Sequence, residues 1–300
     1  MRGFSAVIAT GNRSEMLTRT IESIAKQSCQ PLEIIIVDSS SDHDTFSVCR
    51  SFKNLNANIK YVQANKKGSA SQRNQGVSLA DHPFILFCDD DIVFQPNCLE
   101  KLWEAINLSP DVGGCNALIS NQKFHEPGTT SRIFYQLMSG GKKVNAGECF
   151  GPVINLLPDD NPNLPAHVEV DWLNTTCTLY RREALPEPPF DDHFSGYSLM
   201  EDVALSLRVR KSWKLLNVRE AIIFHDSQTG GEKSDIRAMA HMDLVNRYYI
   251  MKNVLGQAVL KNLFKLAAHQ LFMAIASGNV AKTQCWKGKY SGIKAIIDLK

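Results

Sequence analysis

The sequence predicts an α/β fold with a mainly parallel sheet, and three observations lead to that prediction. Short apolar runs, typical of buried strands, alternate with amphipathic helical segments through the first half of the chain. Each apolar run ends in polar or acidic residues. The chain has 300 residues, of which 44% are hydrophobic and 21% charged, so it can bury a large core and has the composition of a globular protein.

The elements of the first half follow this alternation in order. The expected strands cover residues 4–9, 32–37, 58–62 and 84–88, and the expected helices cover residues 14–27, about 44–53, about 69–79 and 96–108. Because parallel strands end at the same edge of a sheet, Thr10, Asp38 and the acids that follow residue 88 are expected along one rim.

The second half gives weaker signals. Residues 120–165 are rich in Gly, Pro and Asn, so we expect loops there with a short helix near 131–138. Order is expected to resume with strands, helices and a long helical segment. The strands are expected over 167–172, 176–180, 214–218 and 221–224, and a helix over 201–213; the segment 232–275 is expected to be nearly all helix.

Three consecutive carboxylates, Asp89, Asp90 and Asp91, follow the fourth apolar run. They are expected in the crevice where open α/β sheets bind ligands. Adjacent acids repel one another, and Mg²⁺ and Mn²⁺ favour oxygen ligands, including carboxylates combined with substrate phosphates. The triplet therefore indicates a metal–diphosphate site. A solvated acidic turn after a strand is the alternative interpretation.

The composition of the chain limits its expected binding partners and its expected cellular compartment. A net charge of +2 without long basic runs argues against a nucleic-acid partner. The eight cysteines lack any disulfide or zinc spacing, which favours reduced, buried thiols in a cytosol. The first residues enter a strand at once and do not read as a signal peptide. No run approaches the roughly 18 apolar residues that span a bilayer, so we expect a cytoplasmic protein, with peripheral membrane contact as an option.

Five segments together resemble the family 2 glycosyltransferases of the GT-A fold. They are residues 5–13, the strand end at 35–40, the helix at 68–76, the triplet at 87–91 and the segment 200–208. The resemblance covers roughly residues 3 to 230. It implies a nucleotide-binding α/β/α sandwich that uses Mn²⁺ or Mg²⁺ to transfer sugar, with inversion, from a UDP-, GDP- or dTDP-sugar to an acceptor hydroxyl.

The resemblance implies a set of donor-binding residues, and the residue types suit that task. Loop N–H groups and a guanidinium fit ribose and phosphate oxygens, and a carboxylate can accept hydrogen bonds from a nucleobase. The expected donor-binding residues are Thr10, Asn12, Arg13, Asp38, Arg73, Asp89 and Asp90. The alternatives are a turn cap for Asp38, an exposed helix start for Arg13, and a salt bridge from Arg73 to Asp38 or Asp89.

The metal would be held by Asp91 and Asp89, with His225 as a third ligand. His225 follows an apolar run at 221–224, and imidazole also binds Mn²⁺. A structural histidine or a phosphate contact is the alternative for His225. Which acid of the triplet contacts the donor and which binds the metal is left open by one position along the chain.

The resemblance makes Asp202 the general base that takes the proton of the acceptor hydroxyl. Glu201, Trp172 and Asn174 are then expected to contact the acceptor, a saccharide or a lipid-linked saccharide. Simple capping of the helix that begins at Glu201 is the alternative.

The sequence departs from the family pattern in two places. Asn174 or Thr175 stands where relatives usually carry a glycine. A Gln-x-x-Arg-Trp motif is absent, which favours single addition over processive synthesis.

The expected domains are a catalytic domain over 1–231, with a nucleotide-sugar half at 1–115 and an acceptor half at 116–231, and a helical extension over 232–300. Within that extension Lys261, Lys265 and His269 recur every four residues among apolar ones. This pattern fits an interfacial helix that reaches a lipid-linked acceptor, or a helix that packs on the domain or on a second subunit.

Three other functions compete. The run that ends in Asp89-x-Asp91 also resembles haloacid-dehalogenase-like phosphatases, although that family places its motif on the first strand and three strands precede it here. A sugar-nucleotide-binding protein without catalysis is the second alternative. A nucleotidyltransferase is the third, and Gly11-Asn12-Arg13 is a poor match to its Gly-rich basic loop.

Overall fold

The computed structural model describes residues 3–52, 56–196, 198–227, 235–276 and 282–298. Two compact units divide the chain: unit 1 comprises Met1–Phe124 and Pro158–Ser227, and unit 2 comprises His125–Leu157 and Gln228–Lys300. The boundary expected at residue 231 assigned 125–157 to the catalytic domain, whereas these residues group with the C-terminal helices in unit 2. The functional division into domains stays a prediction.

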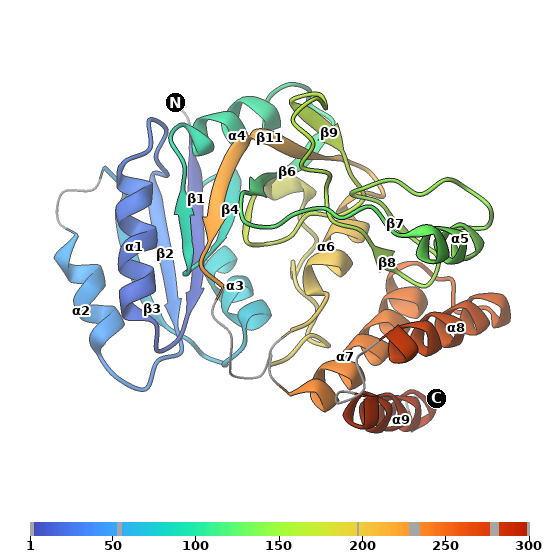
Figure 1. The fold of residues 1–300 in the computed structure, drawn as a ribbon. Coiled ribbons are helices and arrows are strands. Elements are labelled where there is room, and N and C mark those ends of the chain that lie inside the picture. The colour runs from blue at the N-terminus through green and yellow to red at the C-terminus, as the bar shows by residue number, and fades with distance from the viewer. Residues whose placement is uncertain (1–2, 53–55, 197, 228–234, 277–281, 299–300) are drawn as a thin grey trace. The chain divides into compact units, whose positions relative to one another are not determined.

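Unit 1 is built on a nine-stranded sheet with the order β3-β2-β1-β4-β10-β6-β11-β5, and β9 pairs with β11. Figure 1 labels the parallel strands β3, β2, β1 and β4 of this sheet. The strands β3, β2, β1 and β4 are parallel, as are β6 and β11, whereas β10, β5 and β9 run antiparallel to their neighbours. The strands are β1 (Phe4–Thr10), β2 (Glu33–Asp38), β3 (Asn58–Gln63), β4 (Phe84–Asp89), β5 (Ile92–Phe94), β6 (Val112–Ile119), β9 (His167–Glu169), β10 (Cys177–Arg181) and β11 (Lys214–His225). The expected mainly parallel α/β sheet is confirmed.

The helices of unit 1 begin where the sequence predicts them, within two residues. They are α1 (Ser14–Ala25), α2 (Asp44–Ser51), α3 (Ser69–Ser78), α4 (Cys98–Ile106) and α6 (Glu201–Val209), with a 3-10 turn at Arg182–Ala184. The buried face of α1 carries Leu17, Ile21 and Ile24, as the helical period requires. Helix α3 approaches β1 very closely, since a Cβ added to Gly76 would collide with the side chain of Val7.

Strand β6 lies in the sheet interior although the sequence analysis did not predict it. Its sequence, VGGCNALI, has neither a clear period nor a strong β-propensity. Both glycines are needed because there is no room for a side chain. A Cβ added to Gly113 would lie 2.5 Å from Trp213 Cβ, and a Cβ added to Gly114 would lie 2.6 Å from the Tyr180 ring. The two strands expected over 214–224 are one strand, β11, with irregular register between Val218 and Ile222.

Unit 2 contains helices and one small hairpin. They are α5 (Thr129–Met138), β7 (Cys149–Phe150), β8 (Ile154–Asn155), α7 (Ile236–Tyr249), a π-helical turn (Ile250–Val254), α8 (Leu260–Ala276) and α9 (Lys282–Asp298). The expected helix near 131–138 is present. The segment expected to be nearly all helix is helical over 236–275 except between Val254 and Leu260, where Gly256 has a φ of 63°. Residues 232–234 lie outside the described ranges.

A buried polar network joins three segments of unit 2. Arg247 Nε donates to Asp243 Oδ1 over 2.8 Å, and Gln270 Nε2 donates to Asp243 Oδ2 over 2.9 Å. Lys289 Nζ in turn donates to Gln270 Oε1. This network therefore ties α7, α8 and α9 to one another. Among the helices formed by the described residues, none combines the length and hydrophobicity needed to cross a bilayer.

Candidate functional site

The strand register of unit 1 brings the expected rim residues together. Thr10 lies opposite Asp38, and Ala9 lies opposite Asp89, at the carboxyl ends of β1, β2 and β4. The Thr10 hydroxyl donates to Asp90 Oδ2 over 2.6 Å. The first loop and the acidic triplet are thus directly joined.

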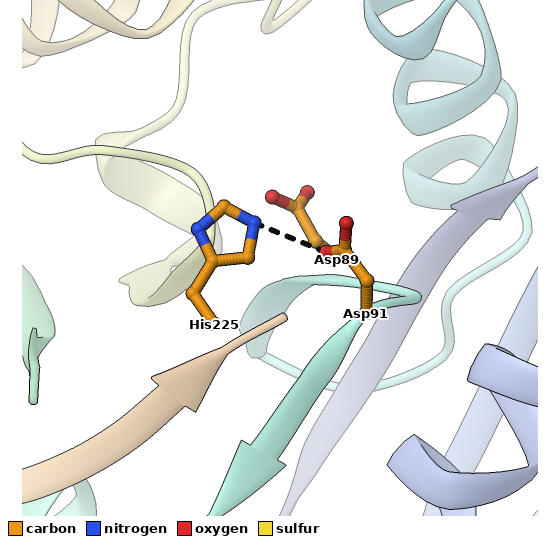
Figure 2. A group of neighbouring side chains, drawn as sticks. All are labelled: Asp89, Asp91 and His225. Carbon is orange, nitrogen blue, oxygen red and sulfur yellow. Dashed lines mark ion pairs between the residues drawn. The ribbon is translucent and has the colours of Figure 1, made fainter. Parts of the chain in front are cut away.

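Three side chains form a candidate divalent-metal site at this edge. One ligand atom from each of Asp89, Asp91 and His225 lies within 4.8 Å of the others. His225 Nε2 is 3.1 Å from Asp91 Oδ1, and Figure 2 shows the imidazole and both carboxylates pointing toward one another. Two carboxylates and an imidazole are a donor set that suits Mn²⁺ and similar ions, so the residues fit a metal.

Strand pairing explains how His225 reaches the triplet across more than 130 positions of sequence. Strand β5 begins one residue after Asp91 and pairs antiparallel with the end of β11, which sets His225 opposite Ile92. The N–H of Asp226 also donates to the carbonyl of Asp91 over 2.8 Å. The imidazole is therefore placed by backbone hydrogen bonds and is not carried on a free loop.

Arg13 and Thr10 surround Asp90, which is almost fully buried. Arg13 NH1 lies 3.2 Å from Asp90 Oδ1 and 3.2 Å from Asp91 Oδ2. Burial raises the pKa of the Asp90 carboxyl to about 6, although Thr10 and Arg13 oppose that rise. The Arg13 side chain is 40% exposed, so it can also reach a ligand.

Asp38 is completely buried, and two residues that the sequence analysis did not single out hold its carboxylate. The N–H and hydroxyl of Ser40 donate to Asp38 Oδ1 over 2.9 and 2.5 Å, and the Tyr61 hydroxyl donates to Oδ2 over 3.0 Å. Asn12 joins the same region, since its N–H donates to Ser40 Oγ over 2.7 Å. The turn-cap role offered as an alternative for Asp38 is present, because its carboxylate accepts from the N–H of Ser40; a nucleobase contact stays a prediction.

Arg73 connects the metal cluster to the start of α6. Its NH2 lies 2.7 Å from Asp89 Oδ1, and its NH1 lies 3.1 Å from Glu201 Oε1. The guanidinium is buried and lies 5.7 Å from the centre of the Phe190 ring. The salt bridge to Asp89 that the sequence analysis offered as an alternative is present.

Glu201 and Asp202 open α6 behind two residues with unusual backbone. Ser198 and Met200 have φ values of 56° and 71°, the left-handed region that side chains other than glycine seldom adopt. Asp202 Oδ1 accepts from the N–H of Val203 over 2.7 Å. Burial raises the pKa of both carboxyls, while Arg73 opposes the rise.

The two remaining residues expected to contact the acceptor differ in burial. Trp172 is buried, and its neighbour Leu173 donates its N–H to Ser206 of α6 over 2.9 Å. Asn174 is half-buried, and its Oδ1 has no hydrogen-bond partner among the described residues. An acceptor contact from either residue stays a prediction.

The family assignment follows from a match over residues 5–187 to the family described as glycosyl transferase family 2. The chain belongs to glycosyl transferase family 2. The match includes the first loop, Asp38, Arg73 and the triplet, and it ends before Glu201. Family membership favours a sugar transferase over the phosphatase and nucleotidyltransferase alternatives.

Curated relatives carry the same kind of enzyme name. The chain is 31% identical over 103 residues to the glycosyltransferase GlyG of Streptococcus pneumoniae, covering 34% of each chain. It is 34% identical over 109 residues to the GalNAc(5)-diNAcBac-PP-undecaprenol beta-1,3-glucosyltransferase of Campylobacter jejuni, covering 36% of this chain and 35% of that protein. The matched segments thus span about a third of the length of these relatives.

Solved structures support the fold of this family 2 member. A TarS fragment of S. aureus in complex with UDP-GlcNAc aligns with a TM-score of 0.60 at 16% identity, covering 98% of this chain and 81% of that one. The mannosyltransferase PcManGT of Pyrobaculum calidifontis in complex with GDP-Man and Mn²⁺ aligns with a TM-score of 0.55 at 15% identity, covering 97% and 80%. The expected glycosyltransferase fold is confirmed by these alignments.

Two residues of this family 2 chain that the sequence analysis did not single out hold the triplet and the neighbouring strand ends in place. The Thr20 hydroxyl donates to the carbonyls of Asp90 and Ile92, each over 2.8 Å. Gln72 Nε2 donates to the carbonyls of Thr10 and Val37, again over 2.8 Å each. Thr20 could have been found from the sequence, because it is a polar residue on the apolar face of α1 beside Leu17, Ile21 and Ile24.

Proposed function

We propose that this chain is an inverting glycosyltransferase that moves a sugar from a nucleoside-diphosphate sugar to an acceptor hydroxyl. The observation that carries the proposal is the link, through Arg73, between the Asp89–Asp91–His225 cluster and the helix start that bears Asp202. A diphosphate site and a buried carboxylate near it are the two groups that such a transfer needs.

The excess of negative charge supports a cationic ligand. Five carboxylates, on Asp89, Asp90, Asp91, Glu201 and Asp202, face the guanidinium groups of Arg13 and Arg73. A divalent ion bound by Asp89, Asp91 and His225 would neutralise the charge that develops on the departing diphosphate. We assign this ion as Mn²⁺ or Mg²⁺.

Asp202 takes the role of general base in this proposal. Its carboxylate accepts the proton of the acceptor hydroxyl as that oxygen bonds to the anomeric carbon, on the side opposite the leaving diphosphate. The configuration at that carbon is then inverted. Glu201 is held by Arg73 and orients the acceptor, and Trp172 and Asn174 are proposed as further acceptor contacts.

Thr10, Asn12, Arg13, Asp38, Arg73, Asp89 and Asp90 form the donor-binding side, and the donor is a UDP-, GDP- or dTDP-sugar. Similar structures were solved with UDP-GlcNAc and with GDP-Man. We propose a saccharide or lipid-linked saccharide acceptor in cell-surface polysaccharide or glycolipid synthesis, in the cytoplasm. The undecaprenol-linked glycan in the name of the Campylobacter jejuni relative supports a lipid-linked acceptor.

Release of nucleoside diphosphate from a panel of nucleotide sugars, with Mn²⁺ and mixed saccharide acceptors, tests this function. With the active pair identified, Asp202→Asn should lower kcat by about 10²- to 10⁴-fold, because the general base is lost. Asp44→Asn is the matched control, since Asp44 also lies in the first turn of a helix but is exposed. Full turnover by Asp202→Asn, with donor binding intact, would refute the assignment of the base.

A further inference from the structure

Helix α8 of unit 2 turns an apolar face to solvent. Leu260, Phe264, Leu271 and Ile275 follow the helical period, and Leu260 and Phe264 are 70% and 68% exposed. Ala267 continues the same row and is also exposed. A helix on the surface of a globular unit normally presents its polar face to water, so an exposed apolar row of this length is unusual.

Internal contacts of unit 2 fix that orientation. The opposite side of α8 is buried, with the apolar Leu266 and Ala274 beside the polar His269 and Gln270. Lys265 Nζ donates to the carbonyl of Met138 over 2.6 Å, and Phe272 stacks on Phe134 of α5 with ring centres 4.4 Å apart. Of the three residues expected on one basic face, Lys261 alone is exposed, while Lys265 and His269 turn inward.

Helix α9 repeats the arrangement with different residues. Trp286, Tyr290, Ile293 and Ile297 are exposed at helical spacing, and their neighbours Lys287 and Lys294 are exposed as well. The other side of α9 packs closely on α7 through Gly288, where an added Cβ would collide with the carbonyl of Arg237. The aromatic and basic row is therefore held outward.

The charge of this region is strongly one-sided. Residues 255–300 contain seven lysines and a single acidic residue, Asp298. Lys265 and Lys289 turn inward, whereas Lys261, Lys287 and Lys294 are exposed. Aromatic rings beside lysines suit the boundary between lipid headgroups and acyl chains, where the rings enter the apolar layer and the ammonium groups meet phosphates. Lysines that lie at a membrane surface are attracted to anionic lipids in particular.

We propose that α8 and α9 form a binding surface for an anionic lipid bilayer. The exposed rows of α8 and α9 enter the headgroup region, and Lys261, Lys287 and Lys294 contact lipid phosphates. A second copy of the chain is the less suitable occupant, because it would bring the same excess of lysines against this surface. The proposal does not depend on the transferase reaction and is tested without a sugar donor.

Sedimentation of the full chain with vesicles tests the proposal. Binding to vesicles of phosphatidylcholine and phosphatidylglycerol in equal parts should be at least about tenfold tighter than to phosphatidylcholine alone, and should weaken at least about tenfold when NaCl rises from about 50 to about 500 mM. The emission of Trp286 should shift to shorter wavelength on binding, a shift that Trp286→Phe removes.

Two variants separate the apolar from the electrostatic contribution. The triple change Leu260→Gln, Phe264→Gln and Leu271→Gln should lower vesicle binding about tenfold or more, and Lys287→Gln with Lys294→Gln should remove most of the preference for phosphatidylglycerol. Leu108→Gln is the control, because Leu108 is an exposed leucine of unit 1. Circular dichroism checks that the helices remain.

Three results would overturn the proposal. The first is no sedimentation with phosphatidylglycerol vesicles at low salt. The second is unchanged binding by both variants. The third is a dimer in light scattering that the triple α8 variant dissolves, which would make this face an interface between copies.

Discussion

At the scale of the residue, burial of Asp202 sets the pH range in which the proposed base can act. Burial raises the pKa of Asp202 to about 6, above the usual range of an aspartate. The base works only when it is deprotonated, so activity is lost as pH falls through that pKa. An ordinary exposed aspartate would keep its activity to about pH 4.

We therefore predict an acidic limb near pH 6 in the profile of kcat at saturating metal and donor. Turnover measured between pH 5 and 9 should fall about tenfold for each pH unit below the limb. Donor affinity measured over the same range separates this effect from titration at the metal site. A rate that stays flat down to pH 5 would show that Asp202 is not the base or that it is not desolvated during turnover.

Arg73 contributes to stability as well as to the proposed donor site. Removing a buried partner leaves uncompensated charges, in this case on Asp89 and Glu201. Arg73→Met should lower the free energy of unfolding by about 3 kcal/mol in urea titrations followed by circular dichroism.

The matched control is Arg19→Met, which removes an exposed ion pair with Asp226 whose atoms are 2.6 Å apart. Its effect should stay below about 1 kcal/mol. If the two variants lose the same amount of stability, burial of the Arg73 pair has no energetic consequence and the argument from desolvation is wrong.

At the scale of the element, the close approach of α3 to β1 positions Arg73 against the triplet. Because a Cβ at Gly76 would collide with Val7, Gly76→Ala must push the helix from the sheet. We predict a loss of about 1–3 kcal/mol of unfolding free energy, measured by denaturant titration. Gly128→Ala is the control, since nothing lies within 4 Å of a Cβ there and its φ is −59°.

Adding Val7→Ala to Gly76→Ala gives a second check on that contact. If the collision is the cause, the double variant should lose less than the two single variants together. Strict additivity of the two losses would instead assign the effect of Gly76→Ala to some other change in α3.

The strands of unit 1 show which features could be predicted from the sequence and why others could not. The strands β1, β2 and β4 end in Thr10, Asp38 and Asp89, so the parallel alternation alone was enough to predict one rim. Strand β6 escaped because its glycines are selected by the side chains of Trp213 and Tyr180, which are distant in sequence. The pairing of β5 with β11, which brings His225 to Asp91, is a tertiary contact with no local signal.

At the scale of the whole molecule, every expected site residue lies in unit 1. Unit 1 is formed by two separate stretches of chain, and the segment between them, His125–Leu157, belongs to unit 2. The composition could not predict that residues 125–157 belong to unit 2, because residues 120–165 have the composition of irregular loops. It also could not predict which face of α8 is exposed, since that depends on contacts with α5.

Calorimetry of nucleoside diphosphate binding tests the central claim, that Asp89, Asp91 and His225 hold a divalent ion on which a diphosphate binds. UDP, GDP and dTDP should be titrated with Mn²⁺ and again with excess chelator. We predict that the preferred nucleotide binds at least about tenfold tighter with Mn²⁺, and that Asp91→Asn and His225→Ala each remove most of this difference. Equal affinity with Mn²⁺ and with chelator, or an unchanged metal effect in both variants, would contradict the account.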